Sequence, residues 1–162
     1  MGYQKRRVVV TGGLGFIGSN LAIKLAQLGA NVTVVDNSTP GCGANTHNLD
    51  PMAGRIRVLP LDIASAALER EIGESDLIFN LAGEVSHTHS MRYPERDLQI
   101  NVIAQLRFLQ LCARRAPGVR CVYANTRQVY GVPEYLPLDE THPVNCLAIA
   151  VAAAGSRQTA LT

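Results

Sequence analysis

The sequence lacks a strong excess of charge of either sign, and it lacks any long hydrophobic run. Its formal net charge is +2, too small to indicate a nucleic-acid partner, and the cluster of Lys5, Arg6 and Arg7 is typical of a solvated lead-in to a strand. The longest apolar stretch, residues 146–155, is too short to span a bilayer, and no secretory signal is recognisable. These absences predict a cytoplasmic protein that binds neither nucleic acid nor membrane.

Cysteine is scarce, and its spacing does not fit the common metal motifs. The four residues are Cys42, Cys112, Cys121 and Cys146, and no two form a C-x-x-C pair. His87 and His89 form an H-x-H pair, but the sequence indicates no third ligand. We therefore predict free thiols in a reducing compartment and no metal site.

The sequence does contain a regular alternation of apolar runs and helical segments, in an ordinary globular composition of 47% hydrophobic and 17% charged residues. The patterns predict strands over 7–11, 31–36, 56–60, 76–82 and 119–124, helices over 16–28, 64–72 and 97–115, and a polar loop over 37–54. This alternation predicts an α/β fold with a doubly wound parallel sheet of five or more strands.

Two of the predicted helices carry apolar residues at helical spacing. In the segment 16–28 they are Ile17, Leu21, Leu25 and Leu28. In the segment 97–115 they are Leu98, Val102, Leu106, Leu109 and Ala113. We expect each set to line one face of its helix.

A glycine-rich loop, Thr11-Gly-Gly-Leu-Gly-Phe-Ile-Gly18, joins the first strand to the first helix. Gly12 permits a tight turn, Gly15 lets the backbone approach a pyrophosphate, and Gly18 allows the helix to pack closely on the strand. The start of the helix then offers free N–H groups and a partial positive charge to phosphates. In this strand–loop–helix context the loop predicts a dinucleotide site in a Rossmann-type fold.

Asp36 ends the second strand, eighteen residues after Gly18. Its carboxylate can accept hydrogen bonds from the adenosine ribose hydroxyls, whereas it would repel a 2′-phosphate. The three residues that follow, Asn37, Ser38 and Thr39, supply no arginine to compensate. The sequence therefore favours NAD over NADP, although Asp36 could also cap a turn. A flavin or NADP protein on the same fold is a further alternative.

The loop has the spacing G-x-x-G-x-x-G, and further motifs follow it: Val35-Asp36-Asn37, Leu61-Asp62-Ile63, Asn80-Leu-Ala-Gly83, Asn101, and Ala124-Asn-Thr-Arg-Gln-Val-Tyr-Gly131. On these motifs the sequence resembles the extended short-chain dehydrogenase/reductases, the NAD-dependent nucleotide-sugar epimerases and dehydratases, from residue 8 to about 145. The resemblance implies the strand order 3-2-1-4-5, NAD as cofactor and a nucleotide sugar as substrate.

The resemblance also implies cofactor contacts beyond the glycines and Asp36. Phe16 and Ile17 would give backbone N–H groups to the pyrophosphate, and the Asp62 side chain would bind the amino group of adenine. The other implied cofactor positions are Asn37, Ile63, Leu81, Ala82, Gly83 and Asn101.

Substrate and catalytic roles are implied after the fourth and fifth strands. Glu84, Ser86 and His87 match positions where family members hold the sugar or diphosphate. Thr126 matches the Ser/Thr whose hydroxyl bonds the sugar oxygen that is oxidised or reprotonated. The helix 97–115 is one of two helices that form the family's dimer interface, so a homodimer through it is an expectation.

Three of these residues have a purely structural alternative. Asp62 could cap the short helix that follows it, and Thr126 could satisfy a backbone group at the end of a strand. Asn101, in the middle of a helix, could hold a bulged backbone as in the family or face solvent.

The sequence departs from the family in lacking a Tyr-x-x-x-Lys pair after Asn145. In the family the tyrosine is the general acid/base, and the lysine lowers its pKa and holds the nicotinamide ribose. The only lysines here are Lys5 and Lys24, and the last tyrosine is Tyr135. We therefore divide the chain into an NAD-binding domain, 1–145, and an atypical alanine-rich tail, 146–162, with no substrate domain. A truncated or frame-shifted product and a catalytically silent relative both fit this pattern.

Two functions from different classes remain open on the sequence. The chain is either the NAD-binding domain of a nucleotide-sugar epimerase or dehydratase, with little or no turnover of its own, or a non-catalytic NAD-binding sensor or partner subunit. The sequence does not specify the sugar, the reaction outcome or the oligomeric state. Alanine favours a helix in the tail, whose apolar faces would need a partner.

Overall fold

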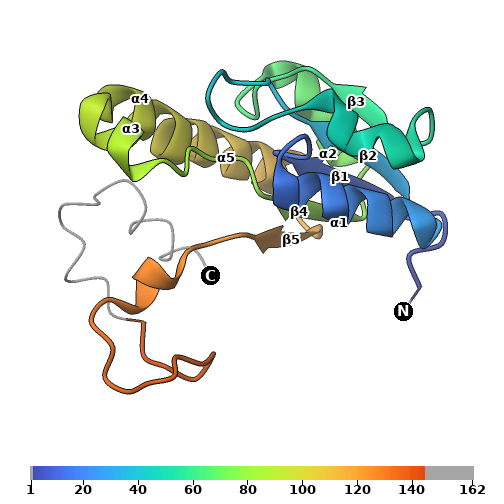
Figure 1. The fold of residues 1–162 in the computed structure, drawn as a ribbon. Helices are drawn as coiled ribbons and strands as arrows, with labels where there is room; N and C mark the ends of the chain where they lie inside the picture. Colours follow the sequence, from blue (N-terminus) through green and yellow to red (C-terminus); the bar gives the residue numbers. More distant parts are fainter. Residues whose placement is uncertain (1, 145–162) are drawn as a thin grey trace. The chain divides into compact units, whose positions relative to one another are not determined.

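The computed structural model describes residues 2–144 (Figure 1). The chain divides into two compact units, residues 1–124 and 125–162. The first unit contains the whole sheet and the helices that cover it. The second is described separately below, over residues 125–144. The expectation for the tail 146–162 lies outside the described residues.

Five parallel strands form one sheet in the order β3-β2-β1-β4-β5. They are β1 Arg7–Thr11, β2 Asn31–Val35, β3 Arg57–Leu59, β4 Leu77–Asn80 and β5 Arg120–Tyr123. Val10, in the middle of β1, lies opposite Val34 of β2 on one side and Phe79 of β4 on the other. The predicted doubly wound Rossmann-type sheet and its strand order are confirmed.

Helical segments connect the strands. The α-helices of the first unit are α1 Phe16–Gln27, α2 Glu69–Gly73, α3 His87–Arg92, α4 Pro94–Leu98 and α5 Gln105–Arg115. The 3-10 helices are η1 Thr46–Met52 and η2 Ala66–Leu68, and a π-helical segment, η3 Gln99–Ala104, joins α4 to α5. The predicted strands are all present, and their bounds lie within one residue of the expected ones, except that β4 ends two residues earlier than predicted.

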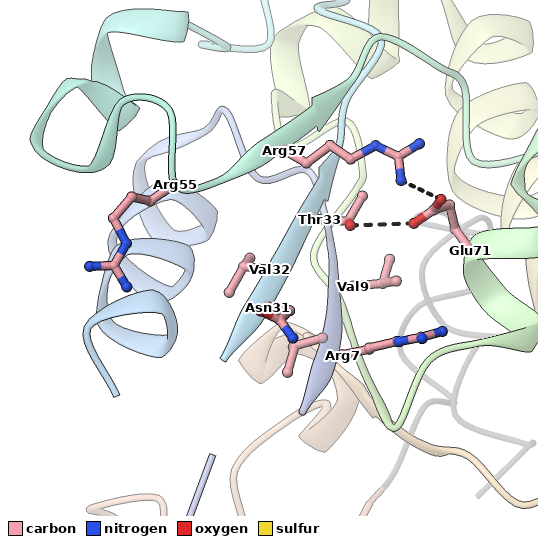
Figure 2. A pocket seen from close by; sticks show the side chains of 9 residues that line it. Arg7, Val9, Asn31, Val32, Thr33, Arg55, Arg57 and Glu71 are labelled. Atoms are coloured by element: carbon pink, nitrogen blue, oxygen red, sulfur yellow. Dashed lines mark hydrogen bonds and ion pairs between the residues drawn. The ribbon is translucent and has the colours of Figure 1, made fainter. Parts of the chain in front are cut away.

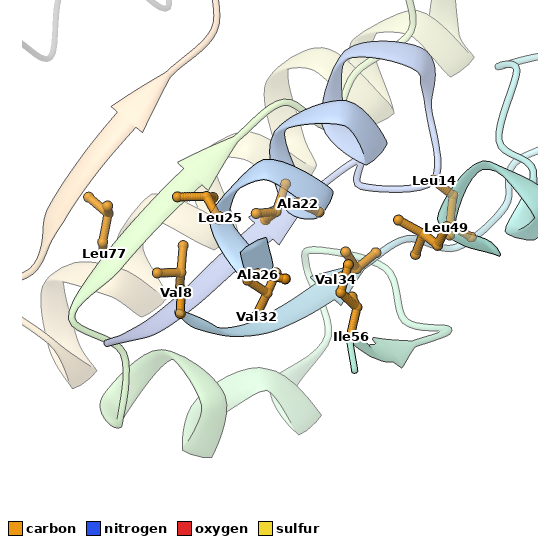
Figure 3. Close-up of a cluster of buried hydrophobic side chains, with 12 residues drawn as sticks. Val8, Leu14, Ala22, Leu25, Ala26, Val32, Val34, Leu49, Ile56 and Leu77 are labelled. Atoms are coloured by element: carbon orange, nitrogen blue, oxygen red, sulfur yellow. The ribbon is translucent and has the colours of Figure 1, made fainter. Parts of the chain in front are cut away.

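Each face of the sheet has its own apolar core, because successive strand residues point to opposite faces. Val8 and Val10 of β1 pack with residues from α1 and η1 (Figure 3). Val9, between them, packs on the other face with residues from α2 and α5, where Phe108 is fully buried. Burial on both faces explains why the strands are nearly continuous β-branched runs.

The apolar face predicted for α1 is only partly correct. Leu25 is buried, but the side chains of Ile17 and Leu28 are 68% and 43% exposed. The residues of α1 that the sheet and neighbouring elements bury are mostly small: Gly18, Ser19, Ala22, Leu25 and Ala26. Small side chains let the helix approach the sheet closely. The spacing of large apolar residues therefore predicted a buried face that differs from the observed one.

The predicted helix 97–115 also differs in its bounds, its regularity and its buried face. Helical structure begins at Pro94, and the π-helical segment interrupts it. Of the predicted stripe, Leu98 and Leu106 are 46% and 47% exposed, whereas Ala104, Gln105, Phe108, Leu111 and Cys112 are buried. An extra residue per turn in a π segment shifts the helix face, which a regular 3.6-residue pattern does not anticipate.

Three smaller expectations also change. The predicted loop 37–54 contains η1, whose Leu49 is buried in the core. The helix predicted over 64–72 is a 3-10 turn followed by the short α2. The helix α3 was not predicted, because its polar sequence His87–Arg92 has no apolar periodicity.

The second unit contains one 3-10 helix, η4 Arg127–Tyr130, within residues 125–144. His142 is its buried centre, 3% exposed, and its Nε2 accepts a hydrogen bond from the backbone N–H of Glu134. The rings of Tyr130 and Tyr135 pack against the imidazole. This packing gives the segment an internal order of its own.

Candidate cofactor site

The glycine loop lies where the sequence places it, between the end of β1 and the start of α1. Gly12 has φ +65, and an added Cβ would lie 2.8 Å from the backbone of both Leu81 and Ala82. An added Cβ at Gly18 would lie 2.2 Å from the carbonyl oxygen of Gly12. Both glycines are therefore required by close backbone packing. At Gly12 the glycine loop packs directly against the backbone of the residues that follow β4.

Gly15 differs because it faces open space. An added Cβ there would contact only the Gly12 carbonyl oxygen, at 3.4 Å. Gly15 is the N-cap of α1, with no side-chain hydrogen bond capping the helix and no acidic residue in the first turn. The side chains of Phe16 and Ile17 point outward, 82% and 68% exposed. The uncapped N–H groups and the space above Gly15 fit a pyrophosphate.

Asp36 follows β2, and its carboxylate binds backbone N–H groups of two loops, the glycine loop and the loop that begins at residue 37. Oδ2 accepts a hydrogen bond from the backbone N–H of Leu14 at 3.0 Å, and Oδ1 accepts one from Ser38 N–H at 2.8 Å. The turn-capping alternative is therefore present. A carboxylate oxygen has a second lone-pair site, so a ribose hydroxyl can still donate to it.

Asn37 and Asp62, both predicted on the adenosine side, are in direct contact. Asn37 Nδ2 donates to Asp62 Oδ2 at 2.9 Å, and Asp62 Oδ1 accepts the N–H of Ala64 at 2.8 Å. Asp62 therefore closes a turn before the short helix, whereas the N-cap of that helix is Ser65, so the structural alternative expected for Asp62 is not what the structure shows. The side chain of Ile63 is buried in the core, so only its backbone is available to a cofactor.

A buried polar network fixes the backbone after β4, and the sequence patterns gave no indication of it. The Thr11 hydroxyl donates to Asn80 Oδ1 at 2.6 Å, and Asn80 Nδ2 donates to Gln105 Oε1 at 2.7 Å. Gln105 Nε2 donates to the carbonyl of Ala82 at 2.7 Å, while Leu81 and Ala82 N–H donate to the Thr11 hydroxyl. The only available signal was polar residues within otherwise apolar segments.

Asn101 holds the next stretch of this backbone from the π-helical segment. Its Oδ1 accepts the N–H of Glu84 at 2.9 Å, and its Nδ2 donates to the Glu84 carbonyl at 3.0 Å and to Asp97 at 2.8 Å. An added Cβ at Gly83 would lie 3.1 Å from Asn101 Oδ1. The structure therefore favours the first of the two alternatives for Asn101, a bond to irregular backbone.

The carboxylate of Glu84 is 3% exposed and is engaged by three protein groups. It accepts hydrogen bonds from Ser86 N–H at 3.2 Å and from the Cys42 thiol at 3.4 Å, and its Oε2 lies 3.3 Å from His89 Nδ1. Burial alone would raise the pKa of Glu84, but these three partners outweigh it and hold the pKa below its ordinary value. Glu84 is therefore anionic at neutral pH.

The other predicted substrate-side residues begin α3. Ser86 is its N-cap, and the Ser86 hydroxyl accepts the N–H of His89. His87 is the first residue of the helix. Within residues 2–144, no group of three or more histidine, cysteine or acidic side chains is placed to hold a metal ion.

Thr126 lies in the second unit, apart from the unit that holds all the other predicted site residues. Its N–H donates to Asn125 Oδ1 at 2.8 Å, and its carbonyl accepts Val129 N–H at the start of η4. Its role toward a sugar stays a prediction.

The cysteines within residues 2–144 are free thiols, as expected from their spacing, and Cys146 lies outside the described residues. Burial raises the pKa of Cys112 to about 12, with a further contribution from nearby Cys121. Burial and the Glu84 carboxylate likewise raise the pKa of Cys42. All three are therefore protonated near neutral pH.

A hollow of about 290 Å³ opens elsewhere, near the amino ends of β1 and β2 (Figure 2). Arg7, Arg55 and Arg57 line it together with Glu71. Arg57 pairs with Glu71 at 2.6 Å and Arg7 with Glu74 at 2.7 Å, which compensates much of its positive charge. This hollow lies at the opposite end of the strands from the glycine loop, whereas nucleotides bind doubly wound sheets at the carboxyl ends.

Comparison with known proteins agrees with this geometry. A model of the NAD dependent epimerase/dehydratase family matches residues 8–153. The chain belongs to the NAD dependent epimerase/dehydratase family. The resemblance inferred from the motifs is confirmed, and NAD is the cofactor of this family. Among residues 2–144, no helix is both long and apolar enough to cross a membrane.

Relatives within the family have several activities. A putative UDP-glucose 4-epimerase of Methanocaldococcus jannaschii is 34% identical over 144 residues, which are 87% of this chain and 45% of that protein. UDP-glucuronic acid decarboxylase 1 of Danio rerio is 36% identical over 143 residues, 85% of this chain and 31% of that protein. The chain thus spans less than half the length of these relatives.

Solved structures of family members superpose well. A double mutant of the dTDP-glucose 4,6-dehydratase of Streptomyces venezuelae, solved with NAD bound, has a TM-score of 0.77 and 32% identity, covering 95% of this chain and 50% of that one. The UDP-N-acetylglucosamine 4-epimerase of Methanobrevibacter ruminantium has a TM-score of 0.77 and 28% identity, covering 97% and 50%.

Proposed function

We propose that this chain is an NAD-binding domain of a nucleotide-sugar epimerase or dehydratase, and that it has no turnover by itself. The observation that carries the proposal is the glycine loop, in which Gly12 and Gly18 are fixed by backbone contacts while Gly15 leaves open space beside uncapped N–H groups. Bound NAD would accept hydride from a sugar carbon and return it. Asp36 and Asn37 are neighbours in the chain, and Asn37 hydrogen-bonds to Asp62, so we assign these three residues to the adenosine half.

The absence of a lysine after Lys24 supports the lack of turnover, because the family's tyrosine needs a nearby cation to act as a base near neutral pH. By resemblance, Glu84, Ser86 and His87 are the residues predicted on the substrate side, and the Thr126 hydroxyl is predicted to bond the sugar oxygen. A non-catalytic sensor would bind NAD in the same way. A downstream reading frame that encodes Tyr-x-x-x-Lys would exclude the sensor.

The test is a titration with NAD, NADP and FAD that follows the melting temperature. We expect the largest rise with NAD, since a ligand that binds only the folded state stabilises it more, at a given concentration, the tighter it binds. The variant Asp36→Asn keeps the shape but removes the charge, and should narrow the preference for NAD over NADP. Asp50→Asn, an exposed site, serves as control. A larger shift with NADP than with NAD in the parent chain would contradict our assignment of Asp36.

We further propose that the chain forms a homodimer through the helical segment 97–115. Leu98, Ile103 and Leu106 are 46%, 38% and 47% exposed on this segment, and exposed large apolar side chains of this kind suit an interface between two copies. Sedimentation should show a dimer that Leu106→Arg converts to a monomer and Arg107→Gln does not. A monomeric parent chain would refute this part of the proposal.

A further inference from the structure

The loop of residues 37–45, between β2 and η1, is tied at both ends to the glycine loop. At its start, Asp36 Oδ2 accepts the Leu14 N–H at 3.0 Å. At its end, Asn45 N–H and Asn48 Nδ2 both donate to the Leu14 carbonyl, at 3.1 Å and 2.8 Å. One residue of the glycine loop thus anchors both ends of the β2–η1 loop.

The middle of the β2–η1 loop is tied instead to the chain that follows β4. The Cys42 thiol donates to Glu84 Oε2 at 3.4 Å, and Arg96 Nη2 in α4 donates to the Pro40 carbonyl at 3.2 Å. The raised pKa of Cys42 keeps its thiol protonated and able to donate. The β2–η1 loop therefore links groups that follow β1, β2 and β4.

Glu84 is the fixed point of this link. The Glu84 carboxylate is almost fully buried and is held by Ser86 N–H and His89. The Asn101 side chain binds both the backbone N–H and the backbone carbonyl of Glu84. The imidazole of His89 in turn packs against Tyr93, with ring centroids 4.8 Å apart. Gly41 and Gly43 flank Cys42, and glycine gives a backbone wide conformational freedom. An anchored acceptor such as Glu84 can restrain such a segment.

The position of the Cys42–Glu84 link in the sheet suggests what the link does. In the order β3-β2-β1-β4-β5, β2 and β3 are added on one side of β1, and β4 and β5 are added on the other side. Dinucleotides bind in the crevice at this switch point between β1 and β4. A loop that starts after β2 and is fastened after β4 spans that crevice. A dinucleotide bound in that crevice would require this loop to open before its release.

We propose that Glu84 is a positioning residue, whose carboxylate holds the β2–η1 loop across the carboxyl ends of β1 and β4 and thereby retains bound NAD. The inference rests on the proposed function, because it concerns the same cofactor. It also gives Glu84 a role different from direct contact with a sugar, since both of its carboxylate oxygens are used within the protein.

Amide hydrogen exchange without cofactor tests whether Glu84 holds the loop. Glu84→Gln and Cys42→Ala should each speed exchange over residues 38–45 while leaving β1 and α1 unchanged. Cys42→Ser keeps a donor and should restore protection, and Glu95→Gln, an exposed carboxylate in α4, is the matched control. Parental exchange in both Glu84→Gln and Cys42→Ala would overturn the inference.

Dissociation of NADH, followed by its fluorescence after mixing with excess NAD, tests retention. We expect about tenfold faster release from Glu84→Gln and Cys42→Ala, the effect of losing one hydrogen bond to a buried charge, with association unchanged. Parental release rates in both variants would overturn the inference while leaving NAD binding intact. A parent chain that binds no NADH would overturn the proposed function and the retention step, and loop exchange would still decide whether Glu84 anchors the loop.

Discussion

The glycines of the loop after β1 are required for different physical reasons, which substitution can separate. Gly18 lies against the Gly12 carbonyl, where a Cβ would come within 2.2 Å, whereas Gly15 has φ −75, an ordinary value for any residue. A methyl group at Gly18 must displace backbone, while one at Gly15 only occupies space that a pyrophosphate would need.

We therefore expect Gly18→Ala to lower the free energy of unfolding by about 1–3 kcal/mol, and Gly15→Ala to change it little. Gly15→Ala should instead weaken NAD binding by about tenfold, or 1.4 kcal/mol. Urea unfolding and NAD titration measure the two effects. Equal losses of stability in both variants would contradict the assignment of Gly15 to the cofactor.

The pKa of Glu84 predicts a dependence of stability on acid. Because the folded-state pKa lies below the ordinary value of 4.5, the stabilisation by Glu84 is fully present above that value and is lost as the pH falls through the folded-state pKa. Glu84→Gln should be less stable near neutral pH and should lose less stability on acidification. Urea midpoints at a series of pH values check this. A Glu84→Gln curve parallel to that of the parent chain would argue against it, and Glu95→Gln is the control.

At the scale of elements, the Thr11–Asn80–Gln105 network joins β1, β4 and α5. Gln105→Leu would remove two hydrogen bonds of 2.7 Å each. Asn80 Nδ2 would lose its acceptor, and the Ala82 carbonyl would lose its donor. Since Asn80 is 1% exposed, we expect a loss of about 1–3 kcal/mol in the free energy of unfolding. Gln110→Leu, at an exposed position of the same helix, should be nearly neutral, and equal effects of the two variants would refute the role of the network.

The network also shows where the sequence stops being informative. The glycine loop and Asp36 could be predicted because their signal is local: a strand, a turn and a helix start within one βαβ unit. The hydrogen bonds of the polar network join residues 23 to 71 positions apart, and the link from Cys42 to Glu84 joins residues 42 positions apart, so no local pattern reveals them. The buried face of α5 was missed for a related reason, since the π-helical segment before it changes the rotation of the helix.

At the scale of the whole molecule, the division at residue 124 separates the predicted cofactor residues from Thr126. Every glycine and carboxylate assigned to NAD lies in the first unit, as do all five strands of the sheet. The cores on both faces of the sheet are likewise made of residues from this unit. Cofactor binding should therefore depend on residues 1–124 alone.

A chain that ends after Ala124 should fold and bind NAD within about threefold of the parent affinity, a difference of less than 1 kcal/mol. A chain that ends after Pro117 is the matched control, because it also removes β5, leaves the β4 edge unpaired and takes Cys121 away from the core. We expect this shorter chain to be largely unfolded by circular dichroism. If the chain ending at Ala124 binds NAD more than tenfold more weakly than the parent, residues after 124 contribute directly to the cofactor site, and Thr126 becomes the first residue to examine.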